Sequence, residues 1–168
     1  MTHAFRYFIL SLALIYPGIA LSAKPDVFSR EAMHNEQQAA RLSSEEQDVW
    51  RVIEQWNAAF AANDAKRYFQ FIDDDITVIT PSNPYRVEGL PDDLAEFEFG
   101  IRQGYARVGF FQEIAPIVRV YDDFAFVTYF NRGYYGAEEN GEIAYLKETT
   151  ILRRTDGSWK IVHIHVSR

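Results

Sequence analysis

The chain has 168 residues, of which 48% are apolar and 15% aromatic, so we expect one domain with a substantial hydrophobic core. Its formal net charge is −7, which repels phosphate backbones and argues against nucleic acid as a partner. It contains no cysteine, which excludes disulfides, zinc–thiolate sites and thiol nucleophiles. A chain so rich in Phe and Tyr often encloses a cavity or forms an oligomer interface, although a plain β-rich core accounts for the same composition.

The first 23 residues have the layout of a secretory signal peptide. Arg6 is their only charged side chain, an apolar run covers residues 7–15, and Pro17-Gly18 interrupts it before the small residues Ala20, Ser22 and Ala23. The run is too short for a spanning helix, which disfavours an uncleaved anchor. We therefore expect export to the periplasm or the medium, with no membrane association once residues 1–23 are removed. Residues 24–44 are polar and read as a flexible leader to a domain at residues 45–168.

Helical patterns dominate the first half of this domain. Ser43 and the acids after it predict a capped helix start, and apolar residues at helical spacing continue to Phe60. A second short helix is predicted at residues 65–72, closed by Asp73 to Asp75 in a solvated turn. A strand at residues 76–80 and a short return strand at 85–88 follow, and Pro91 begins a third helix that runs to about Tyr105.

Strand patterns dominate the second half. Four long β-rich runs are predicted, at residues 110–121, 124–135, 143–154 and 158–167. Asp156-Gly157 is a tight hairpin signal between the last two. Strands joined by short turns form an antiparallel meander, so the prediction is an α+β cone in which three N-terminal helices pack on a strongly curved antiparallel sheet. Such a cone leaves a pocket between the helices and the concave face.

These residues resemble the NTF2-like superfamily, which includes SnoaL-like cyclases and ketosteroid isomerases. The likeness spans about residues 46–168 and is greatest to the association (hub) domain of calcium/calmodulin-dependent protein kinase II. It is carried by Asn63-Asp64, by Val87 to Leu90, by Glu148-Thr149 and by the run from Arg153 to Ser167. No phosphate loop or catalytic-loop triplet of a kinase is present, so no kinase activity is expected.

The resemblance also implies a changed pocket. Hub domains line theirs with arginines, and the alignment places Asn131, Thr150 and Val166 at those positions and Asp93 at that of a pocket histidine. A neutral or cationic ligand is therefore favoured over a carboxylate. The alignment also turns Val162, Ile164 and Val166 toward the cavity, and His163 and His165 away from it.

Several side chains are candidates for chemistry. Tyr129, Asn131, Glu148 and Thr150 share a parity on adjacent strands, and Glu148 stands between apolar neighbours, where a buried carboxylate needs a partner such as Arg132 or a cross-strand Tyr. The candidate pocket-lining residues are Tyr85, Asp93, Tyr129, Asn131, Glu148 and Thr150.

His163 and His165 share one strand face, and a structural or interface role is favoured over a role in the pocket. No metal and no cofactor is expected. The favoured function is a small-molecule-binding or oligomer-forming module, at least a homodimer. The alternative is a cofactor-free isomerase, cyclase or hydratase in which a pocket carboxylate such as Asp75, Asp93 or Glu148, with Tyr85 or Tyr129, provides acid–base catalysis.

Overall fold

The structure is a computed structural model that describes residues 37–103, 111–135 and 141–168. The predicted signal peptide and most of the predicted leader lie outside these residues. A short helical turn at residues 37–39 precedes the helices α2 (Ser44–Ala61), α3 (Ala65–Tyr68) and α4 (Leu90–Arg102). The strands are β1 (Ile72–Ile79), β2 (Val87–Glu88), β3 (Phe111–Tyr121), β4 (Phe124–Tyr135), β5 (Glu142–Thr155) and β6 (Ser158–Ser167).

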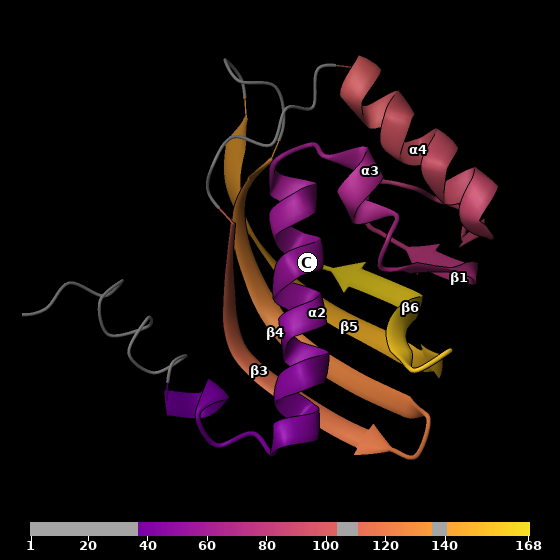
Figure 1. Cartoon of the computed structure of the whole chain (residues 1–168). Helices are drawn as coiled ribbons and strands as arrows, with labels where there is room; N and C mark the ends of the chain where they lie inside the picture. The colour runs from indigo at the N-terminus through magenta and orange to yellow at the C-terminus, as the bar shows by residue number, and fades with distance from the viewer. Residues whose placement is uncertain (1–36, 104–110, 136–140) are drawn as a thin grey trace, which may run out of the picture.

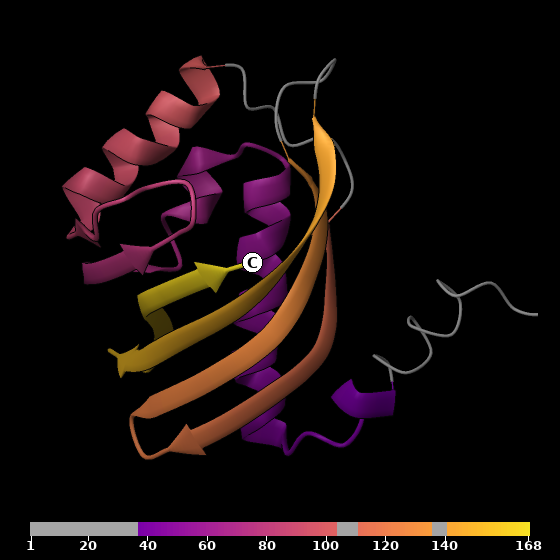
Figure 2. The same cartoon turned by 180° about the vertical axis from the view of Figure 1, so that it is seen from behind.

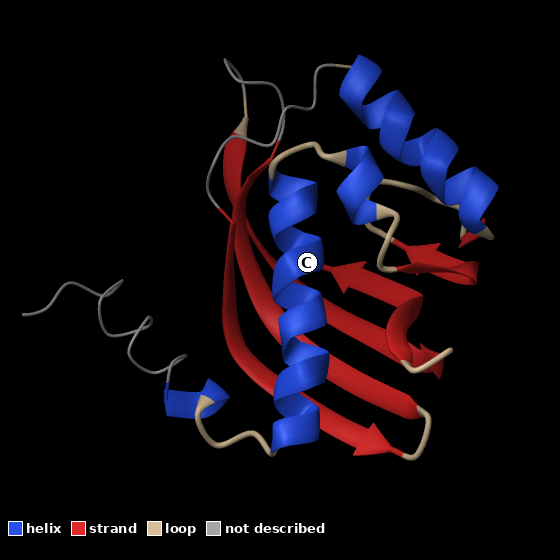
Figure 3. Cartoon of the chain, in the orientation of Figure 1, coloured by secondary structure: helices blue, strands red, loops and turns tan. Residues whose placement is uncertain are grey.

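The fold is α+β, with α2, α3 and α4 gathered on one side of a six-stranded sheet (Figures 1 and 3). The strand order is β2-β1-β6-β5-β4-β3. Long helix α2 crosses the inner face of β3 to β5, and α3 and α4 lie at the β1 end; the view from behind shows the other sheet face without a covering helix (Figure 2). The inner face and α2 together form the hydrophobic core, in which Val49, Ile53, Val118, Val127 and Leu152 are completely buried.

Three features differ from the predicted cone. The sheet is mixed, because β1 pairs parallel with β6 while the other strand pairs are antiparallel. It is not strongly curled, and only two helices are substantial, since α3 is a single turn of four residues. The β1–β6 pairing joins the start of the domain to its end, and periodicity within each segment gives no sign of such a long-range pairing.

Local signals set the ends of several elements. Ser43 caps α2 in a capping box, in which its side chain accepts from the Glu46 backbone and the Glu46 carboxylate accepts from the Ser43 backbone. The β5–β6 hairpin turns at Asp156 and Gly157, whose φ angles of 49° and 77° suit a two-residue turn with both residues left-handed. Both features confirm what the sequence predicts.

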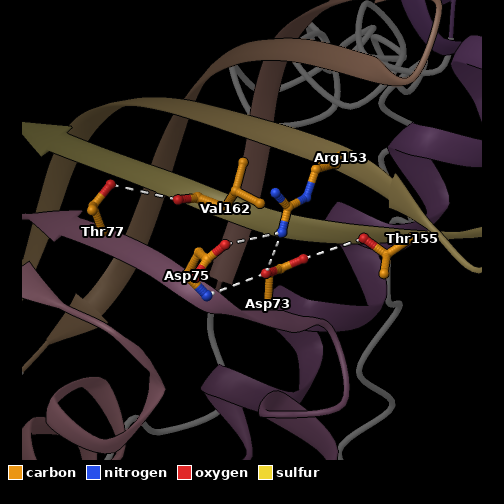
Figure 4. A network of polar contacts seen from close by, with 6 residues as sticks. All are labelled: Asp73, Asp75, Thr77, Arg153, Thr155 and Val162. Carbon is orange, nitrogen blue, oxygen red and sulfur yellow. Dashed lines mark hydrogen bonds and ion pairs between the residues drawn. The ribbon is translucent and has the colours of Figure 1, made fainter.

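Strand β1 begins earlier than predicted and contains the acids that were expected in a solvated turn. Asp73 is buried there, and its carboxylate accepts hydrogen bonds from Arg153 at 2.8 Å and from Thr155 at 3.3 Å (Figure 4). Arg153 also pairs with the exposed Asp75 at 3.3 Å. Burial favours a higher pKa for Asp73, but hydrogen bonds from the Asp75 backbone and from Arg153 outweigh it and hold the pKa below its ordinary value. This network ties the end of β5 to β1 across β6.

Replacing Arg153 with glutamine is expected to lower the free energy of unfolding near neutral pH, because a buried carboxylate loses a charged donor. A depressed folded pKa stabilises the protein above the unfolded pKa of Asp73 and ceases to do so as the pH falls through the folded pKa. The difference between wild type and R153Q in urea unfolding should therefore shrink as the solution is acidified below about pH 4. An equal difference at acidic and neutral pH would show that Arg153 contributes by packing alone.

Candidate functional site

A cluster of polar side chains lies on the inner face of the sheet, around Glu148 of β5. Glu148 is 5% exposed and stands opposite Tyr129 of β4 in the strand register. One of its carboxylate oxygens accepts a short hydrogen bond from the Tyr129 hydroxyl and another from Thr150 at 3.3 Å. The second oxygen accepts from the Asn131 amide at 2.8 Å. Three donors from two strands thus fix one buried carboxyl group.

The cluster continues to helix α2 and strand β3. The buried amide of Asn57 donates to the Tyr129 hydroxyl at 3.1 Å and to the Glu113 carboxylate at 3.0 Å. The Trp50 ring meets the Tyr129 ring edge-on, with centroids 5.5 Å apart. We call these residues the polar cluster: Asn57, Glu113, Tyr129, Asn131, Glu148 and Thr150. It holds two carboxyl groups and no cationic side chain.

Glu113 reaches the inner face because β3 contains a bulge. The strand register shifts between Ile114 and Ile117, and Ala115 has a φ of 56°, in the left-handed region. The bulge inverts the alternation, so Glu113 before it and Val118 after it both face the core. Glu113 and Asn57 are not among the site residues predicted from the sequence. A proline within a strand, here Pro116, is a known sign of a bulge and was the available signal.

Burial controls the protonation of the cluster. It raises the pKa of Glu148 to about 7, although the hydrogen bonds from Tyr129, Asn131 and Thr150 act in the opposite direction. Burial also raises the pKa of Glu113, and burial together with the neighbouring Glu148 raises that of Tyr129. A pKa near 7 is in the range that favours general acid–base catalysis at neutral pH.

The predicted site residues occupy three places. Tyr129, Asn131, Glu148 and Thr150 come together as their parity predicts, and a cross-strand Tyr, not Arg132, is the partner of Glu148. Arg132 points to the outer face, where its guanidinium lies over the Tyr145 ring. Asp93 is buried on α4 and is not among the hydrogen-bond partners of the cluster. Tyr85 is 79% exposed, in the turn before β2.

The two histidines lie on the outer side of β6. His163 shares a 2.8 Å hydrogen bond with Thr77 of β1, and His165 is exposed. The register shifts at Val162, so Ile161 and Ile164 are both buried and Trp159 packs against the core instead of sharing the histidines' face. The hydrogen bond of His163 therefore links β6 to β1.

A hollow of about 650 Å³ lies elsewhere, between the first half of α2 and the β5–β6 hairpin. Its apolar floor is Val52, Phe71 and Trp159, and charged residues such as Glu45, Arg51 and Lys160 form its rim. Arg154 lies over the Trp159 ring and is ion-paired with Glu45. None of the predicted site residues lines this hollow.

Residues 37–103, 111–135 and 141–168 contain no group of three or more His, Cys, Asp or Glu side chains placed to hold a metal ion. Within the same ranges, no helix has both the length and the apolar character that crossing a membrane requires.

In a comparison with known families, residues 49–168 match the SnoaL-like domain. The chain belongs to this family. A comparison with curated proteins gave no match.

Solved structures share the fold. An NTF2-like protein of unknown function from Pseudomonas putida has 21% identity and a TM-score of 0.63, over 74% of this chain and 86% of that one. A ketosteroid isomerase-like protein from Erwinia carotovora atroseptica has 20% identity and a TM-score of 0.61, over 75% and 97%. The calcium/calmodulin-dependent protein kinase II hub of S. rosetta has 23% identity and a TM-score of 0.63, over 75% and 98%. These values establish the fold and do not single out the hub family.

Proposed function

We propose that this SnoaL-like domain binds a small neutral or cationic molecule at the polar cluster. The observation that carries the proposal is Glu148, a buried carboxyl group held by three side-chain donors on the helix-facing side of the sheet. Packing alone does not call for a carboxylate in a layer of Val and Leu, where it is costly. The absence of a cation among the cluster residues disfavours an anionic ligand, in contrast to the arginine-lined pocket expected of hub domains.

The test is a ligand screen by thermal shift on wild type, Glu148→Gln and Tyr129→Phe, with Glu142→Gln as control. Glu142 lies on the same strand and its side chain is 75% exposed. Compounds that stabilise wild type and the control should lose their effect on the two cluster variants. Hits that stabilise all four proteins equally would place binding outside the cluster.

A second candidate function is cofactor-free proton transfer of the isomerase, cyclase or hydratase kind. It is supported by the Glu148 pKa of about 7, which allows the group to accept and return a proton near neutral pH. One solved structure with this fold is described as ketosteroid isomerase-like. Deuterium uptake from D₂O into a panel of ketones, followed by NMR, tests it: exchange should depend on Glu148, and equal exchange by E148Q would contradict it.

We also propose that a second copy of the chain covers the outer sheet face. On the outer face of β3, β4 and β5, large apolar side chains are between 40% and 64% exposed. They include Tyr121, Phe124, Phe126, Phe130 and Tyr145. An apolar surface of this kind on a soluble domain is usually an interface. One solved structure that shares this fold is named the association domain of the C. elegans calcium/calmodulin-dependent protein kinase II.

This proposal predicts a homodimer or a larger homo-oligomer by light scattering. Phe126→Glu places a charge in the middle of the apolar face and should give monomers, while Glu142→Lys should leave assembly unchanged. A wild-type monomer at every concentration would overturn the proposal.

We also propose that the chain is exported and that its N-terminal segment is cleaved. Mass spectrometry of the protein purified from its host should find a new N-terminus close to Ala23. An intact N-terminal segment on the mature protein would contradict cleavage.

A further inference from the structure

Two buried polar atoms near the helices have no hydrogen-bond partner among the described residues. They are the indole Nε1 of Trp56 on α2 and the carboxylate Oδ2 of Asp93 on α4. The two residues are 4% and 6% exposed, so bulk water does not replace the missing partners. Buried polar groups are nearly always paired, and an exception needs an explanation such as an ordered water or a ligand. One atom is a donor and the other an acceptor.

A continuous group of aromatic rings runs from Trp56 to Phe97, which stands one turn after Asp93 on α4. Trp56 contacts Tyr68 with ring centroids 5.4 Å apart, and Tyr68 contacts Phe97 at 4.7 Å. Asp93 precedes Phe97 by one turn of α4, so the two lie on the same side of the helix. Phe60 and Phe69 pack against the same rings and are only partly buried. We call Trp56, Phe60, Tyr68, Phe69 and Phe97 the aromatic cluster.

A purely structural role does not explain Asp93. Acidic residues in a first helical turn are stabilised by the helix dipole, and Asp92 is the exposed residue of α4 that fits this description. Asp93 instead faces inward, where its charge is desolvated and the acidic Glu96 is nearby. An acid at this position is costly to the folded protein unless something binds to it.

We propose that the aromatic cluster binds an apolar, ring-bearing molecule whose hydroxyl or ammonium group donates a hydrogen bond to Asp93 and whose oxygen or ring face accepts one from the Trp56 indole. Aromatic rings provide area for the ring of the ligand, and they also favour a cation. This inference rests on the proposed function, because it names the ligand class of a small-molecule-binding domain. The experiment below distinguishes its failure from that of the Glu148 assignment.

The Trp56 indole proton is itself the reporter. The chain has three Trp residues, so the indole region of a ¹⁵N-correlation spectrum of the full chain should hold three signals, and Trp56→Phe identifies one of them. The probes are benzyl alcohol, benzylamine, benzyl methyl ether, which has no donor, and benzoate. We expect benzyl alcohol or benzylamine to move the Trp56 signal, and the ether and benzoate to bind at least about tenfold more weakly, since one lost donor is worth about that factor. The stronger of the two donors identifies a neutral or a cationic ligand.

Two variants complete the test. Asp93→Asn should weaken the donor probes by about tenfold, while Asp92→Asn, one residue away and exposed, should leave them unchanged. Undisturbed signals of Trp50 and Trp159 will report that the variants remain folded. Three results would each overturn the inference and leave an ordered water as the partner. They are a Trp56 signal that no probe moves, equal binding of the alcohol and the ether, and full binding of the donor probes by D93N.

Glu148→Gln is measured in parallel. If E148Q abolishes binding and D93N does not, the proposed site stands and this inference fails. If D93N abolishes binding and E148Q does not, the inference stands and the ligand does not reach Glu148.

Discussion

Replacing Glu148 with alanine is expected to lower the free energy of unfolding by about 3–5 kcal/mol. The substitution removes a side chain that is only 5% exposed and leaves a cavity. It also leaves three donors, on the buried residues Tyr129, Asn131 and Thr150, without their acceptor. Urea unfolding near neutral pH measures the loss.

The control is Glu142→Ala on the same strand. Glu142 faces solvent, and its ion pair to Arg168, at 4.0 Å, is exposed on both sides. Its removal should change stability by less than about 0.5 kcal/mol. A loss of under about 1 kcal/mol for E148A would mean that the donors find water when the carboxylate is absent, and that the cluster is open to solvent.

Replacing Asp93 with asparagine is expected to stabilise the protein by up to about 3 kcal/mol at about pH 8. Burial, together with repulsion from Glu96, raises the pKa of Asp93 from 3.8 to about 6. The folded protein therefore holds the proton more tightly than the unfolded chain. Ionisation costs nothing below the unfolded pKa, and its cost grows until the pH exceeds the folded pKa.

The stabilisation should consequently disappear as the pH falls toward about 4. Thermal unfolding of wild type and D93N across this range measures it, with Asp92→Asn as the matched control. Asp92 is exposed at the N-terminus of α4, and its loss should cost up to about 1 kcal/mol at low ionic strength through the helix dipole. A D93N protein that is less stable than wild type at about pH 8 would show that Asp93 has a partner in the folded chain.

Much of the fold follows from local sequence. Ser43 and Glu46 start α2, Asp156-Gly157 turns the last hairpin, and strand alternation places Tyr129, Glu148 and Thr150 on one face. Each of these rests on residues within a few positions of one another or on directly paired strands. The mixed sheet does not follow, because β1 pairs with a strand more than eighty residues away: Thr77 stands beside His163.

Some of the site residues could likewise be predicted from local sequence, and others could not. The β4 and β5 members of the polar cluster could be predicted because their strands alternate regularly across the register. Glu113 could not, because the bulge at Ala115 reverses the alternation of β3. Asn57 sits beside Trp56 on the apolar side of α2, where a polar residue in a buried helical position is a signal that the prediction did not use. The burial of Asp93 could not be predicted from local sequence either, because it depends on how other elements pack around α4.

The most direct measurement is crystallographic fragment screening of the protein at high resolution. Binding at the polar cluster predicts fragments whose donor groups lie within hydrogen-bond distance of Glu113, Glu148 or the Tyr129 hydroxyl, on the helix-facing side of the sheet. Fragments found only in the hollow beside Trp159 or on the outer sheet face, with the cluster closed by its own side chains, would contradict a ligand site there.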